Sequence, residues 1–129
     1  MTDSAAVPGP LRVLLADPDD RVRESLAGLL RIGQRCHVVG SAGTADGVLR
    51  LAAECTPDVL VVDPRLAGSD GATAFIARVR EVSPATRILV LDWSDTADHL
   101  SGADAYGRKT FRPHELIDAV VSTVRPSVA

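Results

Sequence analysis

Aromatic residues, lysine and long hydrophobic runs are all scarce in this sequence. Aromatic side chains make up 3% of the 129 residues, which is too few to form platforms for stacking nucleobases. The longest apolar runs are about five or six residues, far short of the roughly 20 that a membrane-spanning helix needs. The net charge of −3 provides no general attraction to nucleic acids or to anionic lipids. The sequence thus argues against a nucleic-acid-binding protein and against a membrane protein.

Cysteine and histidine are also sparse. The two cysteines, Cys36 and Cys55, have neither metal-binding spacing nor the pattern of a disulfide framework, and the three histidines are scattered. A zinc site is therefore not expected. Because no apolar signal segment opens the chain, we expect a cytoplasmic protein with reduced thiols.

The overall composition is that of an ordinary globular protein. Hydrophobic residues make up 46% of the chain and charged residues 24%, which is enough for a core and a soluble surface in one domain. Residues 1–10 are small and rich in proline and glycine, so we expect a disordered leader followed by one domain over residues 11–126.

Short apolar runs alternate with segments of helical spacing along this domain. The runs at 11–16, 36–40, 58–62 and 87–91 are continuous rather than alternating, which is typical of strands buried on both faces. A weaker fifth run lies at 103–108. Helical apolar stripes lie within 22–30, 45–53, 72–79 and 116–124. The pattern predicts an α/β domain with a parallel sheet covered by helices on both faces. The segment 93–101 is short and poor in apolar residues, so a stunted or irregular fourth helix is expected.

Acidic residues follow several of the predicted strands. Asp17 and Asp19 come after the first, Asp63 after the third and Asp92 after the fourth, while the only lysine, Lys109, follows the fifth. Carboxylates gathered at one sheet edge suit Mg²⁺, and a carboxylate neutralised by a metal and an ammonium group can accept a phosphoryl group. Any one of these aspartates alone is better explained as a turn or helix-capping residue, and Asp20 is expected to cap the first helix.

Three segments resemble the receiver domains of bacterial response regulators. They are PDVLVVDPRLAGSDG at 57–71, RVLLADPDDRVRESLAGLL at 12–30 and ADAYGRKTFRPHELIDAV at 103–120, so the resemblance spans roughly residues 11–125. It implies a flavodoxin-like, five-stranded, doubly wound parallel sheet of order 2-1-3-4-5. It also implies a role in phosphorelay signal transduction within a two-component system. In that role this chain would be a phosphoprotein and not an enzyme.

The resemblance assigns roles to individual residues. Asp63 takes the position of the phosphorylated aspartate, and Asp17 the first position of the acidic pair that holds Mg²⁺. Arg65 would offer its backbone carbonyl to that metal. Lys109 takes the position of the lysine that contacts the phosphoryl group, and Tyr106 that of the aromatic residue that rotates on activation.

The sequence also departs from the family pattern. Pro18 stands at the second acidic position and has no side-chain oxygen, so Asp19 becomes the candidate for that role and Mg²⁺ is expected to bind weakly or not at all. Asp92 stands where the family has a hydroxyl residue, and a carboxylate repels phosphoryl oxygens. We expect Asp92 to pair with Lys109 in competition with Asp63. Trp93 is expected to cover part of the sheet edge or to contact a dimer partner.

Two functions fit these features best. The first is an atypical receiver whose switch is weakened or independent of phosphorylation and which acts on a protein partner or as a homodimer. The second is a conventional Mg²⁺-dependent receiver that a histidine kinase phosphorylates on Asp63. A distant third is a phosphatase of the haloacid-dehalogenase type, suggested only by the motif Asp17-Pro18-Asp19. No helix-turn-helix pattern follows residue 125, so both a single-domain regulator and part of a longer DNA-binding regulator agree with the sequence.

Overall fold

A computed structural model describes residues 9–93 and 102–124 of the chain. Its five strands form one sheet in which every neighbouring pair is parallel, in the order β2-β1-β3-β4-β5. Both the order and the direction confirm the prediction. The strands are β1 (Leu11–Ala16), β2 (Cys36–Ala42), β3 (Val59–Val62), β4 (Arg87–Asp92) and β5 (Ala105–Arg108).

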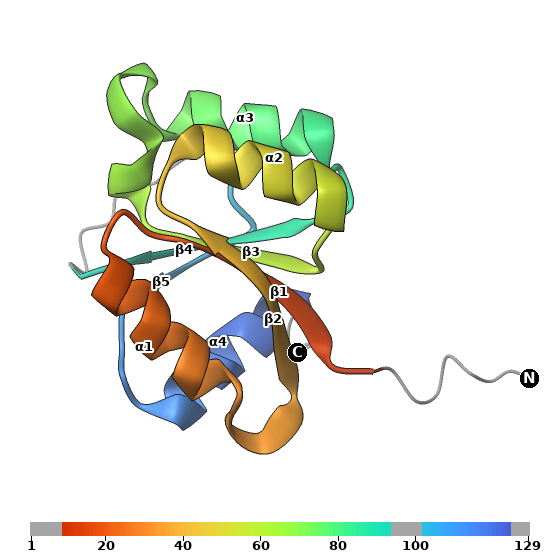
Figure 1. The fold of residues 1–129 in the computed structure, drawn as a ribbon, viewed down its shortest axis with the longest axis vertical. Coiled ribbons are helices and arrows are strands. Elements are labelled where there is room, and N and C mark those ends of the chain that lie inside the picture. Colours follow the sequence, from red (N-terminus) through yellow and green to blue (C-terminus); the bar gives the residue numbers. More distant parts are fainter. Residues whose placement is uncertain (1–8, 94–101, 125–129) are drawn as a thin grey trace, which may run out of the picture.

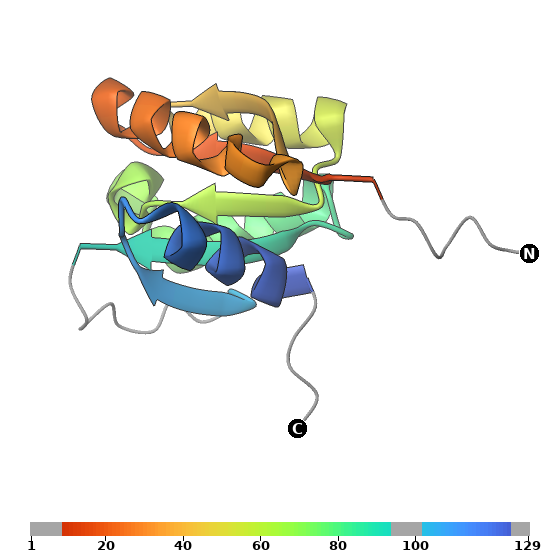
Figure 2. The same ribbon diagram turned by 90° about the horizontal axis from the view of Figure 1, so that it is seen from below.

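Helices cover the sheet on both faces (Figure 1). One face carries α1 and α4, and the opposite face carries α2 and α3. In Figure 2 the strand arrows run the same way, so their carboxyl ends gather along one edge of the domain. The helices are α1 (Asp20–Leu30), α2 (Ala45–Cys55), α3 (Ala72–Val82) and α4 (Pro113–Val124), with short 3₁₀ segments η2 (Ile32–Gln34) and η3 (Pro64–Asp70).

Both faces of strand β1 are buried, and this explains why its sequence does not alternate between polar and apolar residues. Val13 and Leu15 pack into the core beneath α1 and α4, whereas Leu14 and Ala16 pack into the core beneath α2 and α3. All four side chains are buried. Because successive side chains point to opposite faces of a strand, a strand covered on both sides needs apolar residues at every position.

The start of α1 differs from the prediction by one residue. Asp19, not Asp20, is the N-cap: its Oδ1 accepts hydrogen bonds from the backbone N–H groups of Arg21 at 2.9 Å and Val22 at 3.3 Å. Asp20 is the first helical residue instead, where its carboxylate lies near the positive end of the helix dipole. The expectation that Asp20 caps the helix was therefore wrong, because its neighbour has the extended backbone that a cap requires.

Some expectations fall beyond the described residues. The stunted fourth helix was expected at 93–101, of which only Trp93 is described, and most of the expected leader and the end of the domain also lie outside. The helix labelled α4 is the one that the sequence places after the fifth strand. Within the described part of the chain, no helix has the length and apolar character needed to cross a membrane.

Candidate functional site

The carboxyl edge of the sheet brings the predicted acidic residues together. Asp17 directly follows β1 and Asp63 directly follows β3, and these two strands are paired with Ala16 opposite Val62. The backbone N–H of Asp63 donates to the carbonyl of Ala16 at 2.9 Å. The expectation that Asp17 and Asp63 lie side by side is thus confirmed.

Lys109 joins the two carboxylates. Following β5, it directs its Nζ to Asp17 Oδ2 at 2.5 Å and to Asp63 Oδ2. Asp17, Asp63 and Lys109 are only 2%, 1% and 6% exposed. Charges withdrawn from water in this way are stable only when they are paired and hydrogen-bonded, so the three groups form one interdependent unit.

Arg65 is a second cation at Asp63, and the sequence analysis did not foresee its side chain there. Its Nε donates to Asp63 Oδ1 at 3.1 Å and its Nη2 donates to Asp63 Oδ2 at 2.9 Å. The guanidinium group therefore binds both carboxylate oxygens in a bidentate arrangement. The backbone N–H of Arg65 also donates to Asp63 Oδ1, at 2.7 Å. The role of the Arg65 backbone carbonyl stays a prediction. An arginine two residues after an aspartate is too weak a signal to reveal this contact in a chain rich in arginine.

These contacts keep Asp63 ionised. Burial raises the pKa of the Asp63 carboxyl, but hydrogen bonds from the Arg65 side chain, from Lys109 and from the Arg65 backbone lower it more, so its pKa lies below the ordinary value. The same hydrogen bond to Asp63 raises the pKa of Arg65. A carboxylate that remains ionised has the charge state required of a nucleophile.

Asp92 does not make the ion pair expected of it. Asp92 is the last residue of β4, and its Oδ1 accepts a hydrogen bond from the backbone N–H of Trp93 at 2.7 Å. The carboxylates that Lys109 pairs with, among the described residues, are Asp17 and Asp63. The expectation of competition between Asp92 and Asp63 for Lys109 was therefore wrong. Asp92 takes the simpler role of closing the turn, because a backbone donor lies within immediate reach.

Three partly exposed aromatic side chains lie on or near β4 and β5. Trp93 is 44% exposed and packs against Phe111, with 5.6 Å between ring centres. Tyr106, in β5 opposite Val90, is also partly exposed. Tyr106 thus occupies the strand position foreseen for it, while its rotation on activation remains a prediction.

The carboxylate oxygens, as they lie, do not fit a bound Mg²⁺. Asp17 Oδ1 accepts the backbone N–H of Asp19 at 2.9 Å and Asp17 Oδ2 is held by Lys109, while both oxygens of Asp63 are held by cations. Asp19 Oδ1 is engaged in capping α1. Within residues 9–93 and 102–124, no three side chains of metal-binding type form a group that could hold an ion. Since Mg²⁺ requires free oxygen ligands, the arrangement must change before such an ion can bind.

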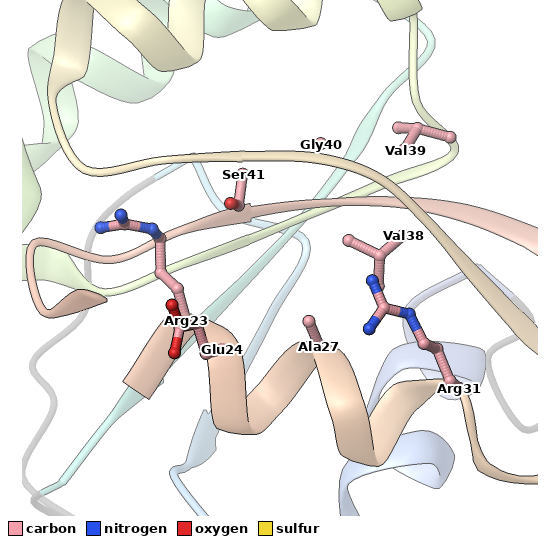
Figure 3. A pocket seen from close by; sticks show the side chains of 8 residues that line it. All are labelled: Arg23, Glu24, Ala27, Arg31, Val38, Val39, Gly40 and Ser41. Atoms are coloured by element: carbon pink, nitrogen blue, oxygen red, sulfur yellow. The ribbon is translucent and has the colours of Figure 1, made fainter. Parts of the chain in front are cut away.

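A second feature missed by the sequence analysis is Arg23, which fixes the loop after β1. Its Nη1 donates to the Asp17 backbone carbonyl at 2.7 Å, and its Nη2 pairs with Asp20. Arg23 lies at the end of a hollow between α1 and β2 (Figure 3), which is lined by Arg23, Glu24, Ala27, Arg31, Val38, Val39, Gly40 and Ser41. It positions the backbone that carries Asp17.

Comparison with known proteins gives a consistent result. The family model described as "Response regulator receiver domain" matches residues 13–121. Two relatives from Bacillus subtilis are the uncharacterized transcriptional regulatory protein YxjL, 32% identical over 123 residues, and the transcriptional regulatory protein LiaR, 33% identical over 114 residues. The alignments cover 89% and 85% of this chain but 55% and 54% of those proteins, so the chain spans about half the length of these curated relatives.

Solved structures agree in fold. The signal receiver domain of the putative response regulator NarL from Mycobacterium tuberculosis has a TM-score of 0.80 and 25% identity, covering 93% of this chain and all of that one. A LuxR-family two-component response regulator from Aurantimonas has a TM-score of 0.77 and 29% identity, covering 91% of this chain and 86% of that one.

The family match covers the strands that carry Asp17, Asp63 and Lys109, and it decides against the phosphatase alternative. Receiver domains are signalling modules that typically bind Mg²⁺, and they are not catalytic enzymes. The matched residues, the strand order and the buried cluster at the carboxyl edge lead to one assignment: this chain belongs to the response regulator receiver domain family of two-component signalling.

Proposed function

We propose that this chain is an atypical receiver in which Asp63 is the phosphoacceptor position and the phosphorylation switch is weakened. The observation that supports it most directly is the contact of the Arg65 guanidinium with both oxygens of the Asp63 carboxylate. The second acidic position of the family is Pro18, which offers no ligand. A nucleophile whose two oxygens are both held by the Arg65 guanidinium reacts more slowly, because that contact must break first.

The reaction itself follows from the family. A carboxylate oxygen of Asp63 attacks the phosphorus of a phosphohistidine on a histidine kinase, the phosphorus–nitrogen bond breaks, and the imidazole leaves with the bonding electron pair and takes up a proton. The product is an acyl phosphate on Asp63. Lys109 supports this step, because its ammonium group already lies against Asp63 and can neutralise charge on the transferring oxygens.

Signalling would then depend on protein contacts. Three partly exposed aromatic residues, Trp93, Tyr106 and Phe111, lie on or next to β4 and β5 and offer apolar surface for a protein partner or a second copy of this chain. The relatives are named as transcriptional regulators, but their names describe proteins about twice as long. With its net charge of −3, this receiver is proposed to act without direct contact to nucleic acid.

The second candidate, a conventional Mg²⁺-dependent receiver, is favoured by one observation. Lys109 contacts both Asp17 and Asp63, which is the arrangement that phosphoryl transfer to Asp63 needs. In this candidate, Arg65 would release Asp63 readily and phosphorylation would proceed at full yield.

Intact-mass measurement separates the two candidates. The protein is incubated with acetyl phosphate and MgCl₂, and the fraction carrying one added phosphoryl group is followed over time. The atypical receiver is expected to be phosphorylated slowly and incompletely, with no addition to Asp63→Asn. Rapid and complete phosphorylation of the wild type would establish the conventional candidate instead.

A further inference from the structure

Among the described residues, Arg65 is the cation at the site that combines contact with a buried carboxylate and wide exposure to water. Its side chain is 57% exposed, whereas that of Lys109 is 1% exposed. We propose that Arg65 is a built-in counter-ion that competes with divalent cations for Asp17 and Asp63, so that Mg²⁺ enters only when the Arg65 side chain leaves. This inference does not depend on whether Asp63 is phosphorylated.

The competition follows from the positions of the guanidinium atoms. Nη2 of Arg65 lies 2.9 Å from Asp63 Oδ2 and 3.9 Å from Asp17 Oδ1, so it stands between the two carboxylates. A divalent ion that bridges these residues needs the same oxygens. Because an oxygen that accepts two charge-assisted hydrogen bonds has little lone-pair density left for a metal, both cations cannot be held at full strength.

The charges lead to the same conclusion. Asp17 and Asp63 contribute two negative charges, and Arg65 and Lys109 contribute two positive charges. These four side chains therefore sum to no net charge while Arg65 is in place, and they attract an incoming cation less than they would without it. Once Arg65 has left, the remaining carboxylates outnumber Lys109 by one charge, and a divalent cation is attracted.

Arg65 is also the cation that can leave at low cost. Its guanidinium is already widely exposed, so its N–H groups can exchange the carboxylate for water. The Nζ of Lys109 is buried between two carboxylates and lies 5.0 Å from the centre of the Trp93 ring, so its departure would strand buried charge. The structure thus distinguishes an exchangeable cation from a permanent one.

The test is a calorimetric titration of the full chain with MgCl₂ in the absence of any phosphodonor. Three variants are compared with the wild type: Arg65→Gln, Arg65→Lys and Arg21→Gln. Arg21 lines the same open hollow as Arg65, next to Pro18, Asp19 and Asp20, so its removal changes the local charge equally without touching the carboxylate contacts. The only tryptophan, Trp93, reports the same titration by fluorescence because it lies over Lys109.

Arg65→Gln is expected to bind Mg²⁺ about tenfold more tightly than the wild type or more, because a unit charge in direct contact with the ligands is removed. Arg65→Lys, which keeps the charge but loses the fork, is expected to bind with intermediate affinity. The Mg²⁺ affinity of Arg21→Gln should stay within about twofold of that of the wild type, since exposed charges are screened by salt. Equal affinity of Arg65→Gln and Arg21→Gln, with thermal unfolding showing that both are folded, would overturn the proposal.

Discussion

The ammonium group of Lys109 faces the indole ring of Trp93, with 5.0 Å between Nζ and the ring centre. The same group also contacts Asp17 and Asp63. Cation–π attraction adds to the ion pairs and helps to hold the lysine in one position. Because Trp93 is the only tryptophan, its fluorescence provides a reading of the site without any label.

Replacing Lys109 by methionine is expected to destabilise the fold strongly. The change leaves two carboxylates buried side by side, and Arg65 is then the cation among the described residues that still contacts them. Breaking a buried ion pair from one side costs about 3–5 kcal/mol. Urea denaturation followed by Trp93 fluorescence and by circular dichroism measures this loss, with Arg21→Gln as the control. A loss under about 1 kcal/mol would show that Lys109 does not hold the site together.

Removing the charge of Asp92 is expected to speed the phosphorylation of Asp63. Asp92 ends β4 at the edge of the sheet where phosphate must arrive, and a fixed negative charge opposes an anion there. Asp92→Asn removes the charge and keeps an oxygen that can accept from the Trp93 N–H, while Asp92→Thr supplies the family's hydroxyl. If the charge is the obstacle, acetyl phosphate should phosphorylate Asp63 faster in both variants than in the wild type, as measured by intact mass. A gain only in Asp92→Thr would assign the effect to the missing hydroxyl instead.

Asp19 is expected to act through the cap of α1. Asp19→Ala removes the acceptor for two backbone N–H groups, and loss of such a cap costs about 1 kcal/mol of stability. Asp19→Ser keeps a capping oxygen and should recover most of that loss in thermal unfolding. If Asp19 were instead a metal ligand, both variants would lose Mg²⁺ affinity equally, whatever their stability.

Acid should destabilise the protein in part through Asp104. Burial raises the pKa of the Asp104 carboxyl, but a hydrogen bond from the Ile88 N–H at 2.7 Å and one from Arg80 at 2.9 Å lower it more. A pKa that is lower in the folded state than in the unfolded state means stability that is present above the unfolded value, about 3.9, and lost as the pH falls through the folded value. The free energy of unfolding of the wild type should therefore fall more steeply with acid than that of Asp104→Asn. Parallel curves below about pH 4 would contradict this.

The sequence predicted the fold and the location of the site well, and for a physical reason. Continuous apolar runs between helical stripes require a sheet buried on both faces, and parallel strands place their carboxyl ends at one edge. Asp17 and Asp63 follow such runs directly and Lys109 follows the weaker fifth strand, so little freedom remained in where they lie. Backbone topology alone brings them together.

The contacts that could not be predicted from the sequence are those that depend on side-chain rotamers. Arg65 has several rotatable bonds. Its side chain contacts Asp63 because the fold places a buried carboxylate within its reach. Asp92 was expected to pair with Lys109, but it accepts a hydrogen bond from the N–H of Trp93, while Lys109 is held by two other carboxylates. The shift of the α1 cap from Asp20 to Asp19 has a different origin, because it depends on which residue has the extended backbone of a cap, and that residue is Asp19.

The dual packing of β1 has a consequence for how the domain opens. Since neighbouring side chains of this strand serve opposite cores, neither pair of helices can separate from the sheet without loosening a strand on which the other pair also depends. Strands β3 and β4 also place alternate side chains in the two cores, so the two halves are coupled through three adjacent strands. The backbone amides of β1 should exchange with deuterium only when the whole domain unfolds, which makes their exchange rates a direct measure of global stability.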